Sequence, residues 1–362
     1  MNRPFNILPY LALICLSLAV LSGCKKVDVP SDDLSQGLVP SGTPITFETE
    51  DPASKAIINS KEDLEQVGNS FRVFSWFEGT TSGSMFGTYG TPVTYTAETS
   101  TSTPAWTYDP PRYWMSGTYN FAAVYPSSVL KTSADDNTVA ATAGYAPSGN
   151  NPLSLNITNF DVTKHQDDLL VAINDPINGS NPPTKVGLNF KHTLACVQIK
   201  LKLNRDDFFD NEMQVGFAYV ELIGFQNIAI AGSMVANDES GNINLSWTPT
   251  SIGALSPADF ERVEVENNSK DIFNGYGLLV IPQSFTNDDA QLYMRVRVEY
   301  PNITSTIINT FTVPLNIGFP AWEPGIRYVY EAEVTQDLLI GFSLIKVEQW
   351  SEEQLGDGFI VN

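Results

Sequence analysis

Alternation of apolar and polar residues with a period of two is the feature that most limits the folds open to this chain. In "LYMRVRVEY" (292–300) and "GIRYVYEAEV" (325–334), apolar side chains fall on one face while arginine and glutamate fall on the other. A period of two is typical of antiparallel strands with one buried face. These segments therefore predict strands that cover a hydrophobic core.

Similar runs recur along the chain with turn residues between them. Strands are predicted at 45–50, 71–77, 119–126 and 153–160, and few stretches keep helical spacing for long. Short strands separated by turns are typical of β-sandwiches, so the sequence predicts an all-β fold. The apolar set changes parity near Cys196, and a β-bulge is the simplest explanation.

Chain length and turn-rich segments predict how the chain divides. Its 362 residues suit two domains of roughly 150 residues each. The prolines and glycine of "NDPINGSNPPTK" (174–185) favour neither a helix nor a central strand. The predicted domains are 44–183 and 184–362. A flexible tether rich in Pro, Ser, Gly and acids is predicted at 24–43.

The first 23 residues are predicted to be an export signal. Arg3 precedes an apolar run at 7–21, which is as long as a signal-peptide core with its flanks. The run ends in Leu21-Ser22-Gly23-Cys24, which resembles the lipobox of bacterial lipoproteins. The resemblance implies cleavage before Cys24 and acylation of that cysteine, for example with palmitate. An ordinary leader followed by an unmodified cysteine is the alternative.

The acidic composition excludes some partners. Asp and Glu number 41 against 20 Lys and Arg, which gives a formal net charge of −21. Such a surface repels nucleic acid and anionic headgroups, so membrane attachment must come from acyl chains. Of Cys15, Cys24 and Cys196, only Cys196 lies within the predicted domains, so no disulfide framework is expected.

The sequence offers little for catalysis, and it predicts no enzyme, no metal site and no cofactor. His192 lies on an apolar face and is interpreted as a core histidine, whereas His165 in "TKHQDD" is interpreted as a surface histidine. The acidic pairs do not have the spacing of facing glycosidase carboxylates. "ANDESGNINLSW" (236–247) is interpreted as a hairpin turn and not as a calcium loop. The acidic pairs are Asp167-Asp168, Asp206-Asp207 and Asp288-Asp289.

Aromatic residues are concentrated in "WTYDPPRYWMSGTYNFAAVYP" (106–126). Such rings serve either as a platform on which sugars stack or as bulk in a sandwich core. The core interpretation is favoured because Tyr119, Phe121, Ala123 and Tyr125 alternate as a buried face does.

An ordered set of segments resembles the fimbrillins of Bacteroidales type V pili and their Mfa-like relatives. The resemblance implies two tandem transthyretin-like β-sandwich domains with Greek-key-like connections, lipoprotein export to the outer membrane surface, and a role in adhesion. It also implies partners: other fimbrial subunits joined by strand exchange after a protease removes the first strand, and a host or bacterial surface ligand. The segments are "ITFETEDPASKA" (45–56), "FRVFSWF" (71–77), "RYWMSGTYNFAAVYP" (112–126), "DLLVA" (168–172), "LNFKHTLACVQIKL" (188–201), "GLLVIPQSF" (277–285) and "WEPGIRYVYEAEV" (322–334).

The same resemblance assigns roles to particular residues. "ITFETE" becomes the leaving strand, with Ile45 and Phe47 facing inward. Ser54-Lys55-Ala56 stands where family members often carry Thr-Arg-Ala, so a protease that accepts lysine would cut between Lys55 and Ala56. An uncut, lipid-anchored accessory protein or glycan- or host-binding adhesin, with Lys55 a plain loop charge, is the alternative.

The C-terminal segment 341–362 is the candidate donor strand. Its apolar residues either fill the groove of another subunit or close the second sandwich of their own molecule, and the sequence leaves both open. The candidate inserting residues are Phe342, Leu344, Val347, Trp350, Phe359 and Val361.

Overall fold

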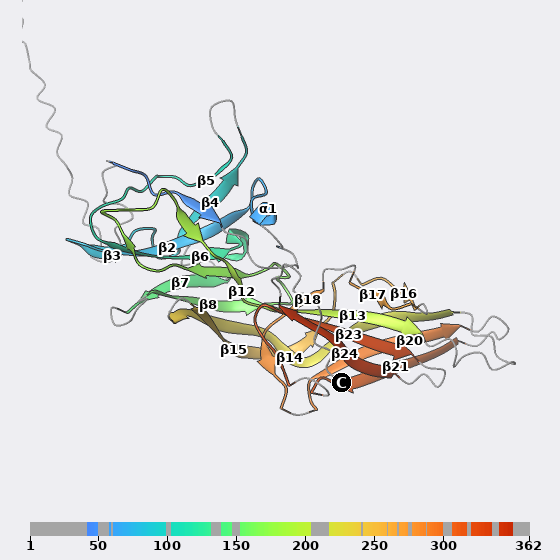
Figure 1. Ribbon diagram of the computed structural model, residues 1–362. Helices are drawn as coiled ribbons and strands as arrows, with labels where there is room; N and C mark the ends of the chain where they lie inside the picture. The colour runs from blue at the N-terminus through green and yellow to red at the C-terminus, as the bar shows by residue number, and fades with distance from the viewer. Residues whose placement is uncertain are drawn as a thin grey trace, which may run out of the picture.

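The computed structural model shows a chain built almost entirely of β-strands, arranged in sheets that pack face to face (Figure 1). Within the described residues, helical structure is limited to α1 (Lys61–Leu64) and the 3-10 turn η1 (Ser127–Val129). The predicted all-β sandwich class is confirmed. The structure describes residues 42–49, 58, 61–98, 103–131, 139–146, 153–203, 217–239, 242–258, 260–265, 268–273, 277–286, 288–299, 306–316, 320–334 and 340–349.

Sheet 1 forms the N-terminal half of the molecule. Its central strands β2 and β6 pair along their length and have buried residues on both faces. In order across the sheet, its strands are β12 (Lys191–His192), β9 (Leu170–Ile173), β6 (Thr118–Tyr125), β2 (Ser70–Glu78), β4 (Thr91–Thr96) and β5 (Ala105–Thr107), with β10 (Ile177–Asn178) beside β6 and β3 (Ser82–Ser84) beside β2.

A separate two-stranded pair covers one face of sheet 1. It joins β1 (Phe47–Thr49) to β11 (Val186–Leu188) in parallel. Strand β1 is shorter than the strand predicted at 45–50, although Ile45 is also buried.

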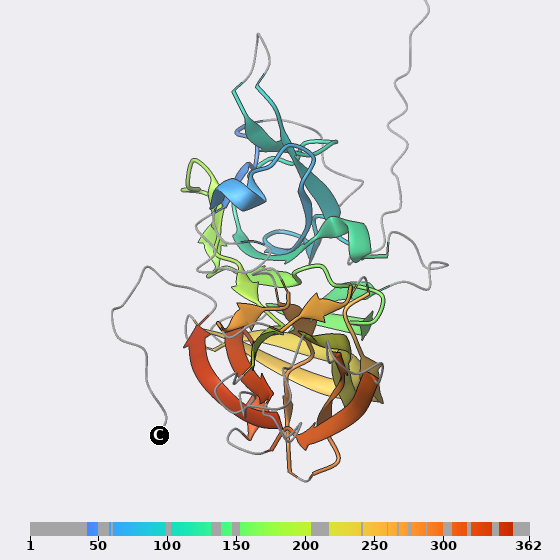
Figure 2. The same ribbon diagram turned by 90° about the vertical axis from the view of Figure 1, so that its right-hand side faces the viewer.

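Sheets 2 and 3 form the C-terminal sandwich, seen below sheet 1 in Figure 2. A further short pair joins β19 (Gln283–Ser284) to β22 (Ala321–Trp322). Sheet 2 runs β21 (Thr306–Pro314), β20 (Gln291–Glu299), β14 (Phe217–Glu239), β8 (Leu153–Asp161) and β7 (Ala140–Tyr145), with β15 (Asn242–Leu255) and β16 (Val263–Glu264) also beside β14. Sheet 3 runs β17 (Lys270–Asp271), β13 (Ala195–Leu203), β23 (Ile326–Val334) and β24 (Ile340–Gln349), with β18 (Leu278–Val280) beside β13.

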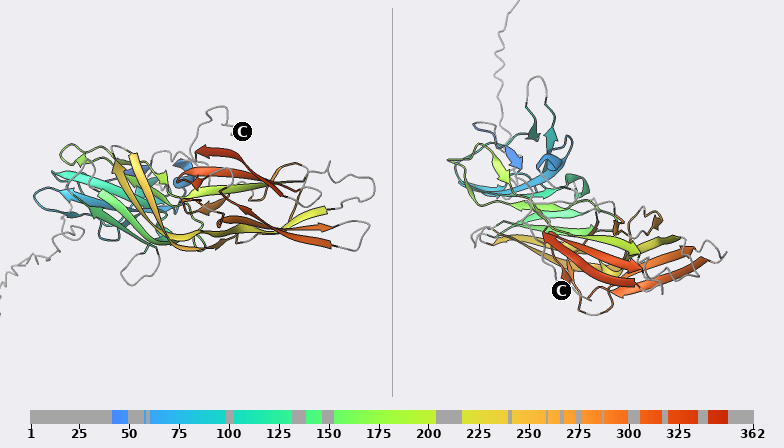
Figure 3. Two further views of the ribbon diagram at one scale, coloured as in Figure 1. Left: turned by 90° about the horizontal axis from the view of Figure 1, so that it is seen from below. Right: turned by 45° about the vertical axis from the view of Figure 1, so that its right-hand side comes forward.

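The long strand β14 connects the two halves (Figure 3). One part of it pairs with β20, and a later part of it pairs with β8. Because β7 and β8 precede Pro183 while β14 follows it, strand pairing crosses the predicted domain boundary. The division at that residue stays a prediction.

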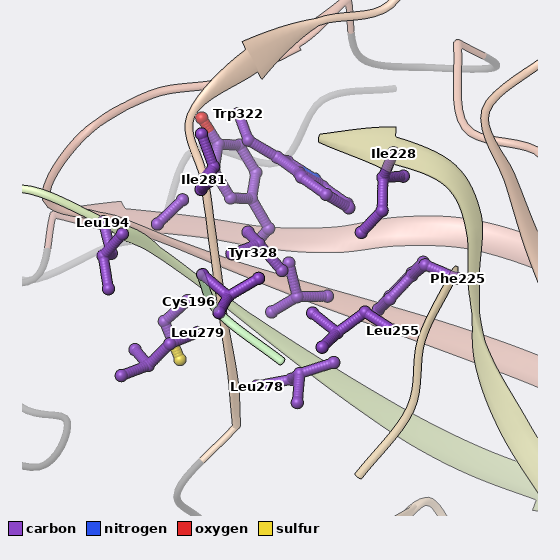
Figure 4. Packing of buried hydrophobic residues seen from close by; sticks show 14 of the residues in the cluster. Leu194, Cys196, Phe225, Ile228, Leu255, Leu278, Leu279, Ile281, Trp322 and Tyr328 are labelled. Carbon is purple, nitrogen blue, oxygen red and sulfur yellow. The ribbon is translucent and has the colours of Figure 1, made fainter. Parts of the chain in front are cut away.

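Two hydrophobic cores lie on opposite faces of sheet 1. The first core contains the aromatic residues under β1, such as Phe71 and Phe121. The second core continues from the other face of sheet 1 into the sandwich of sheets 2 and 3. Figure 4 shows its centre, where Trp322 packs edge-on against Phe225 at a ring distance of 5.3 Å. The hairpin predicted in "ANDESGNINLSW" is confirmed, since Glu239 pairs with Asn242.

The β-bulge predicted near Cys196 is wrong. Strand β12 ends at His192 in sheet 1, and β13 begins at Ala195 in sheet 3 with a regular register against β23. The apolar parity changes there because the chain leaves one sheet for another. Cys196 itself is fully buried, and burial raises the pKa of its thiol to about 12, with a smaller opposing effect from Arg327.

Candidate assembly site

The first described segment is inserted between two parts of the N-terminal half. On one side Phe47 and Thr49 pair in parallel with Val186 and Leu188 of β11. On the other side Pro44 forms an antiparallel bridge with Tyr113. The segment therefore supplies a strand that joins otherwise separate chain regions.

Hydrogen bonds hold this segment on both edges. Their donors and acceptors are mainly backbone groups, so they depend on the path of the chain more than on side-chain identity. The bonds run from the Ile45 N–H to the Arg112 carbonyl (2.8 Å), from the Trp114 N–H to the Thr43 carbonyl (3.0 Å), from the Val186 N–H to the Thr46 carbonyl (2.8 Å) and from the Tyr108 hydroxyl to the Ile45 carbonyl (2.9 Å).

Aromatic rings form the floor and walls around Phe47. Ile45 and Phe47 are 1% and 2% exposed, so both face inward. Burial raises the pKa of Tyr108 to about 12, with Arg112 acting in the opposite direction. Loss of Phe47 would therefore uncover a groove lined by aromatic side chains. The ring centroids nearest to that of Phe47 belong to Tyr108 (5.8 Å), Phe121 (5.8 Å), Phe86 (5.9 Å) and Phe71 (6.3 Å).

The aromatic segment 106–126 contributes to this core. Trp106 and Trp114 are also buried, and Tyr119 and Phe121 stack with their rings 5.9 Å apart. The core interpretation of these rings is confirmed. A sugar platform would need ring faces open to solvent.

The C-terminal strand β24 closes sheet 3 of its own molecule. It pairs antiparallel with β23, and Phe342 stacks on Tyr330 with the ring centroids 4.8 Å apart. Phe342, Leu344 and Val347 are partly buried against the second core. In the described residues β24 pairs with β23 alone, so its other edge is available to a further strand.

Several predicted site residues lie outside the described residues. They are Cys24, Lys55, Ala56, Trp350, Phe359 and Val361. Their roles stay predictions.

A buried contact between a histidine and an aspartate lies next to Ile58. The Nδ1 atom of His192 is 2.9 Å from Oδ1 of Asp168, and both side chains are almost fully buried. The Ile58 N–H donates to Oδ2 of Asp168 at 3.3 Å. His192 is therefore the core histidine that was predicted, but its contact with Asp168 was not foreseen.

The other polar candidates that the structure describes contact neighbours in different parts of the fold, and Asp206 and Asp207 lie outside the described residues. His165 is half-buried, with Nδ1 3.9 Å from Oδ2 of Asp167. Asp288 accepts a hydrogen bond from the side-chain amide of Asn316 at 2.7 Å. In the ranges that the structure describes, no group of three or more His, Cys, Asp or Glu side chains is arranged to hold a metal ion. Nor does any described helix have the length and apolar character needed to cross a membrane.

Solved structures to which this chain is similar come from Bacteroides and Parabacteroides species. A candidate cell adhesion protein from Bacteroides uniformis is 16% identical, with 85% of this chain and 99% of that chain covered and a TM-score of 0.47. A candidate cell adhesion protein from Bacteroides fragilis is 13% identical, with 89% and 98% covered and a TM-score of 0.41. A fimbrial assembly protein from Parabacteroides distasonis is 7% identical, with 84% and 95% covered and a TM-score of 0.35. These likenesses are too distant to assign a function.

Among curated proteins no match was found. The family model described as fimbrillin-like matches residues 59–350, which is most of the chain. That match begins just after the segment that holds β1 and ends at the end of β24. The chain therefore belongs to the fimbrillin-like family.

Proposed function

We propose that this protein is a structural subunit of a surface fimbria that assembles by strand exchange after its first strand is removed. The observation that carries the proposal is the insertion of Ile45 and Phe47 into an aromatic groove by a segment that precedes a candidate cleavage site. A groove of this kind, once emptied, has both an apolar floor and unpaired backbone edges. Such a groove captures an extended strand by β-augmentation.

The first strand stabilises its domain by an amount that a strand from another subunit can replace. Burial of Ile45 and Phe47 contributes roughly 1.5–3 kcal/mol per side chain, and each backbone hydrogen bond adds about 1 kcal/mol net. The sum is comparable with the lower part of the ~5–15 kcal/mol that stabilises a whole domain. An incoming strand gains a similar amount.

A covalent tether normally decides this competition. A strand in the same chain acts at an effective concentration of about millimolar order, so a strand from another subunit cannot displace it. Cleavage at Lys55 removes that advantage while leaving the groove in place. The proposed donor is the C-terminal segment 341–362 of another subunit, which includes the apolar residues of β24.

Lys55, which stands where family members often carry arginine, is the residue to change in a test of the proposal. In this proposal a protease that accepts lysine cuts between Lys55 and Ala56, so a Lys55→Gln variant stays uncut and monomeric. Intact mass and native gels of protein recovered from cells measure both properties. Lys164→Gln is the matched control, because Lys164 is a 71% exposed lysine that lies outside this segment.

Each outcome of that experiment has a defined meaning. Oligomer ladders that require Lys55 and a loss of residues up to 55 support strand exchange. A wild-type chain that keeps its N-terminal segment and stays monomeric refutes the shaft-subunit proposal in favour of an uncut, lipid-anchored accessory protein or adhesin.

The proposal includes export as a lipoprotein. Acyl chains on Cys24 would anchor the precursor to the outer membrane, because a chain of net charge −21 gains nothing from anionic lipid. The measurement is the mass of the precursor before and after Cys24→Ser. A mass unchanged by any acyl group on the wild-type chain contradicts lipidation.

A further inference from the structure

A polar cavity of about 390 Å³ lies beside the buried pair of Asp168 and His192. Side chains from three regions of the N-terminal half line it, and no lysine or arginine is among its described lining residues. The lining groups that matter chemically are the hydroxyls of Ser70, Tyr125 and Ser127, the amide of Gln166 and the carboxylates of Asp167 and Asp168.

The cavity is negatively charged and is held in shape by its surroundings. Asp168 is fixed by His192, and the amide of Gln166 bonds to both backbone groups of Leu279. Asp167 is different, because its side chain is 51% exposed and its nearest ion-pair partner, His165, lies 3.9 Å away. Asp167 can therefore turn toward a ligand without breaking the core.

Tyr125 supplies a second, independent indication of a ligand. Tyr125 is 8% exposed and lines the cavity, and in the described part of the chain no hydrogen bond is formed by its hydroxyl. A hydroxyl in this position can accept a hydrogen bond from a ligand. Burial, with smaller contributions from the carboxylates of Asp168, Asp167 and Asp63, raises the pKa of Tyr125 to about 12, so the hydroxyl stays protonated at neutral pH.

We propose that this cavity binds a primary ammonium group. An –NH₃⁺ group has three donors and no acceptor, which matches a carboxylate, a tyrosine hydroxyl and a serine hydroxyl that accept. Hydrogen bonds from a cation to a carboxylate are stronger than those from a neutral donor. The charge of Asp167 and Asp168 disfavours an anion, and a neutral polyol gains no charge attraction.

Two sources can present such a group. One is a lysine side chain of another subunit. The other, which rests on the proposed cleavage at Lys55, is the new amino terminus at Ala56. Ala56 precedes Ile58 by two residues, which span at most about 7 Å. The Ile58 nitrogen is 3.3 Å from Oδ2 of Asp168, so Ile58 itself lies next to the cavity that Asp168 lines.

The first experiment uses the uncut full chain and n-butylammonium chloride as the probe, with n-butanol and glucose as neutral comparisons. Amide NMR shifts should show saturable binding of butylammonium at Ser70, Ser127 and Asp167. We expect Asp167→Asn and Tyr125→Phe each to weaken this binding about tenfold or more. Asp175→Asn, which changes an exposed aspartate outside the cavity, should leave it unchanged.

The results that overturn the proposal are equally specific. They are binding of butanol or glucose as tight as that of butylammonium, no saturable shift, or an affinity that does not respond to Asp167→Asn. Glucose binding that needs Asp167 would assign the cavity to a neutral sugar instead.

A second experiment separates the two sources. The chain is cut with a lysine-specific protease and the cut at Lys55 is verified by mass. If the new amino terminus occupies the cavity, the cut chain no longer binds butylammonium, whereas a site for a partner's lysine binds it as before. Both outcomes support an ammonium site. Failure of cells to cut at Lys55 would refute the proposed processing and leave binding to the uncut chain unaffected.

Discussion

Replacing Phe47 with alanine tests how much stability the first strand gives to the uncut chain. Phe47 is 2% exposed, and its ring lies 5.8–6.3 Å from the four rings of the groove. Replacing a buried phenylalanine with alanine lowers the free energy of unfolding by roughly 3–5 kcal/mol, and part of that loss comes from the cavity that the ring leaves behind. The ring contacts place this site at the upper end, so the free energy of unfolding should fall by about 4–5 kcal/mol.

The assay compares urea unfolding of the uncut and cut chains, followed by tryptophan fluorescence. After cleavage at Lys55 and removal of the released segment, wild type and Phe47→Ala have the same sequence, so their difference in stability should vanish. Phe121→Ala is the matched control, because Phe121 lies in the groove floor on β6 and remains in the chain. That variant should be destabilised in both forms.

Two results would refute the reasoning. A stability difference that persists after the cut means that the segment around Phe47 stays bound, so the groove is not emptied. A difference below about 1 kcal/mol in the uncut chain, where surface changes usually fall, means that Phe47 contributes little to the core.

Three further predictions follow from the same packing. Burial raises the pKa of the Cys196 thiol from 9.0 to about 12, so the reactive thiolate is about a thousandfold rarer at pH 8 in the folded chain than in the unfolded chain. Its reaction with a disulfide reagent at pH 8 should therefore be about a thousandfold slower without guanidinium than in guanidinium. Equal rates would contradict this prediction. Burial also raises the pKa of Tyr108 and Tyr330 to about 12, above the ordinary value of 10.0; their neutral forms therefore stabilise the fold fully below pH 10, and this contribution is lost as pH rises toward 12. Urea titrations from pH 8 to 11 should show that loss, and Tyr108→Phe should make it smaller. Phe342→Ala should lower the free energy of unfolding of the monomer by about 2–3 kcal/mol, since the ring is only partly buried. The control is Ile345→Ala, whose side chain is 43% exposed and which should change the free energy of unfolding by less than about 0.5 kcal/mol. An unchanged stability of the Phe342→Ala monomer would mean that β24 does not contribute to its own sandwich.

Local alternation predicted strands well where one face is buried and the other is wet. In β20 the apolar residues from Leu292 to Val298 are buried on one face while Arg295 is exposed on the other. Strand β23 follows the same rule, with Tyr328 and Tyr330 inside. For such strands the period of two fixes which side chains face the core.

The sequence was less informative where a strand is buried on both faces or changes partners. In β6, Asn120 and Ala122 are as buried as Tyr119 and Phe121, so the alternation there does not mark a wet face. The parity change near Cys196 marks a change of sheet, which a bulge imitates in sequence.

Contacts between distant segments were also out of reach. The Ile58 N–H bonds to Asp168 across 110 positions, and no local pattern encodes that distance. Strand β8 pairs with β14, although other strands also have edges with which it could pair. Which edge a strand pairs with depends on how the whole core assembles and is not encoded in the local sequence. The acidic pair at 167–168 was visible in the sequence, but the side chains that enclose it were not.

The arrangement of the two cores supports the proposal that the chain keeps its fold when its first strand is removed. Tyr119, Phe121 and Ala123 of β6 face the groove that holds Phe47, whereas Ala122 and Val124 face the second core. Emptying the groove therefore uncovers one face of sheet 1 only. The other face stays covered by strands that β14 joins to the C-terminal sandwich. If the proposed removal occurs, a sheet supported from behind in this way keeps its groove ordered, and the entropic cost of ordering on capture then falls on the incoming strand alone.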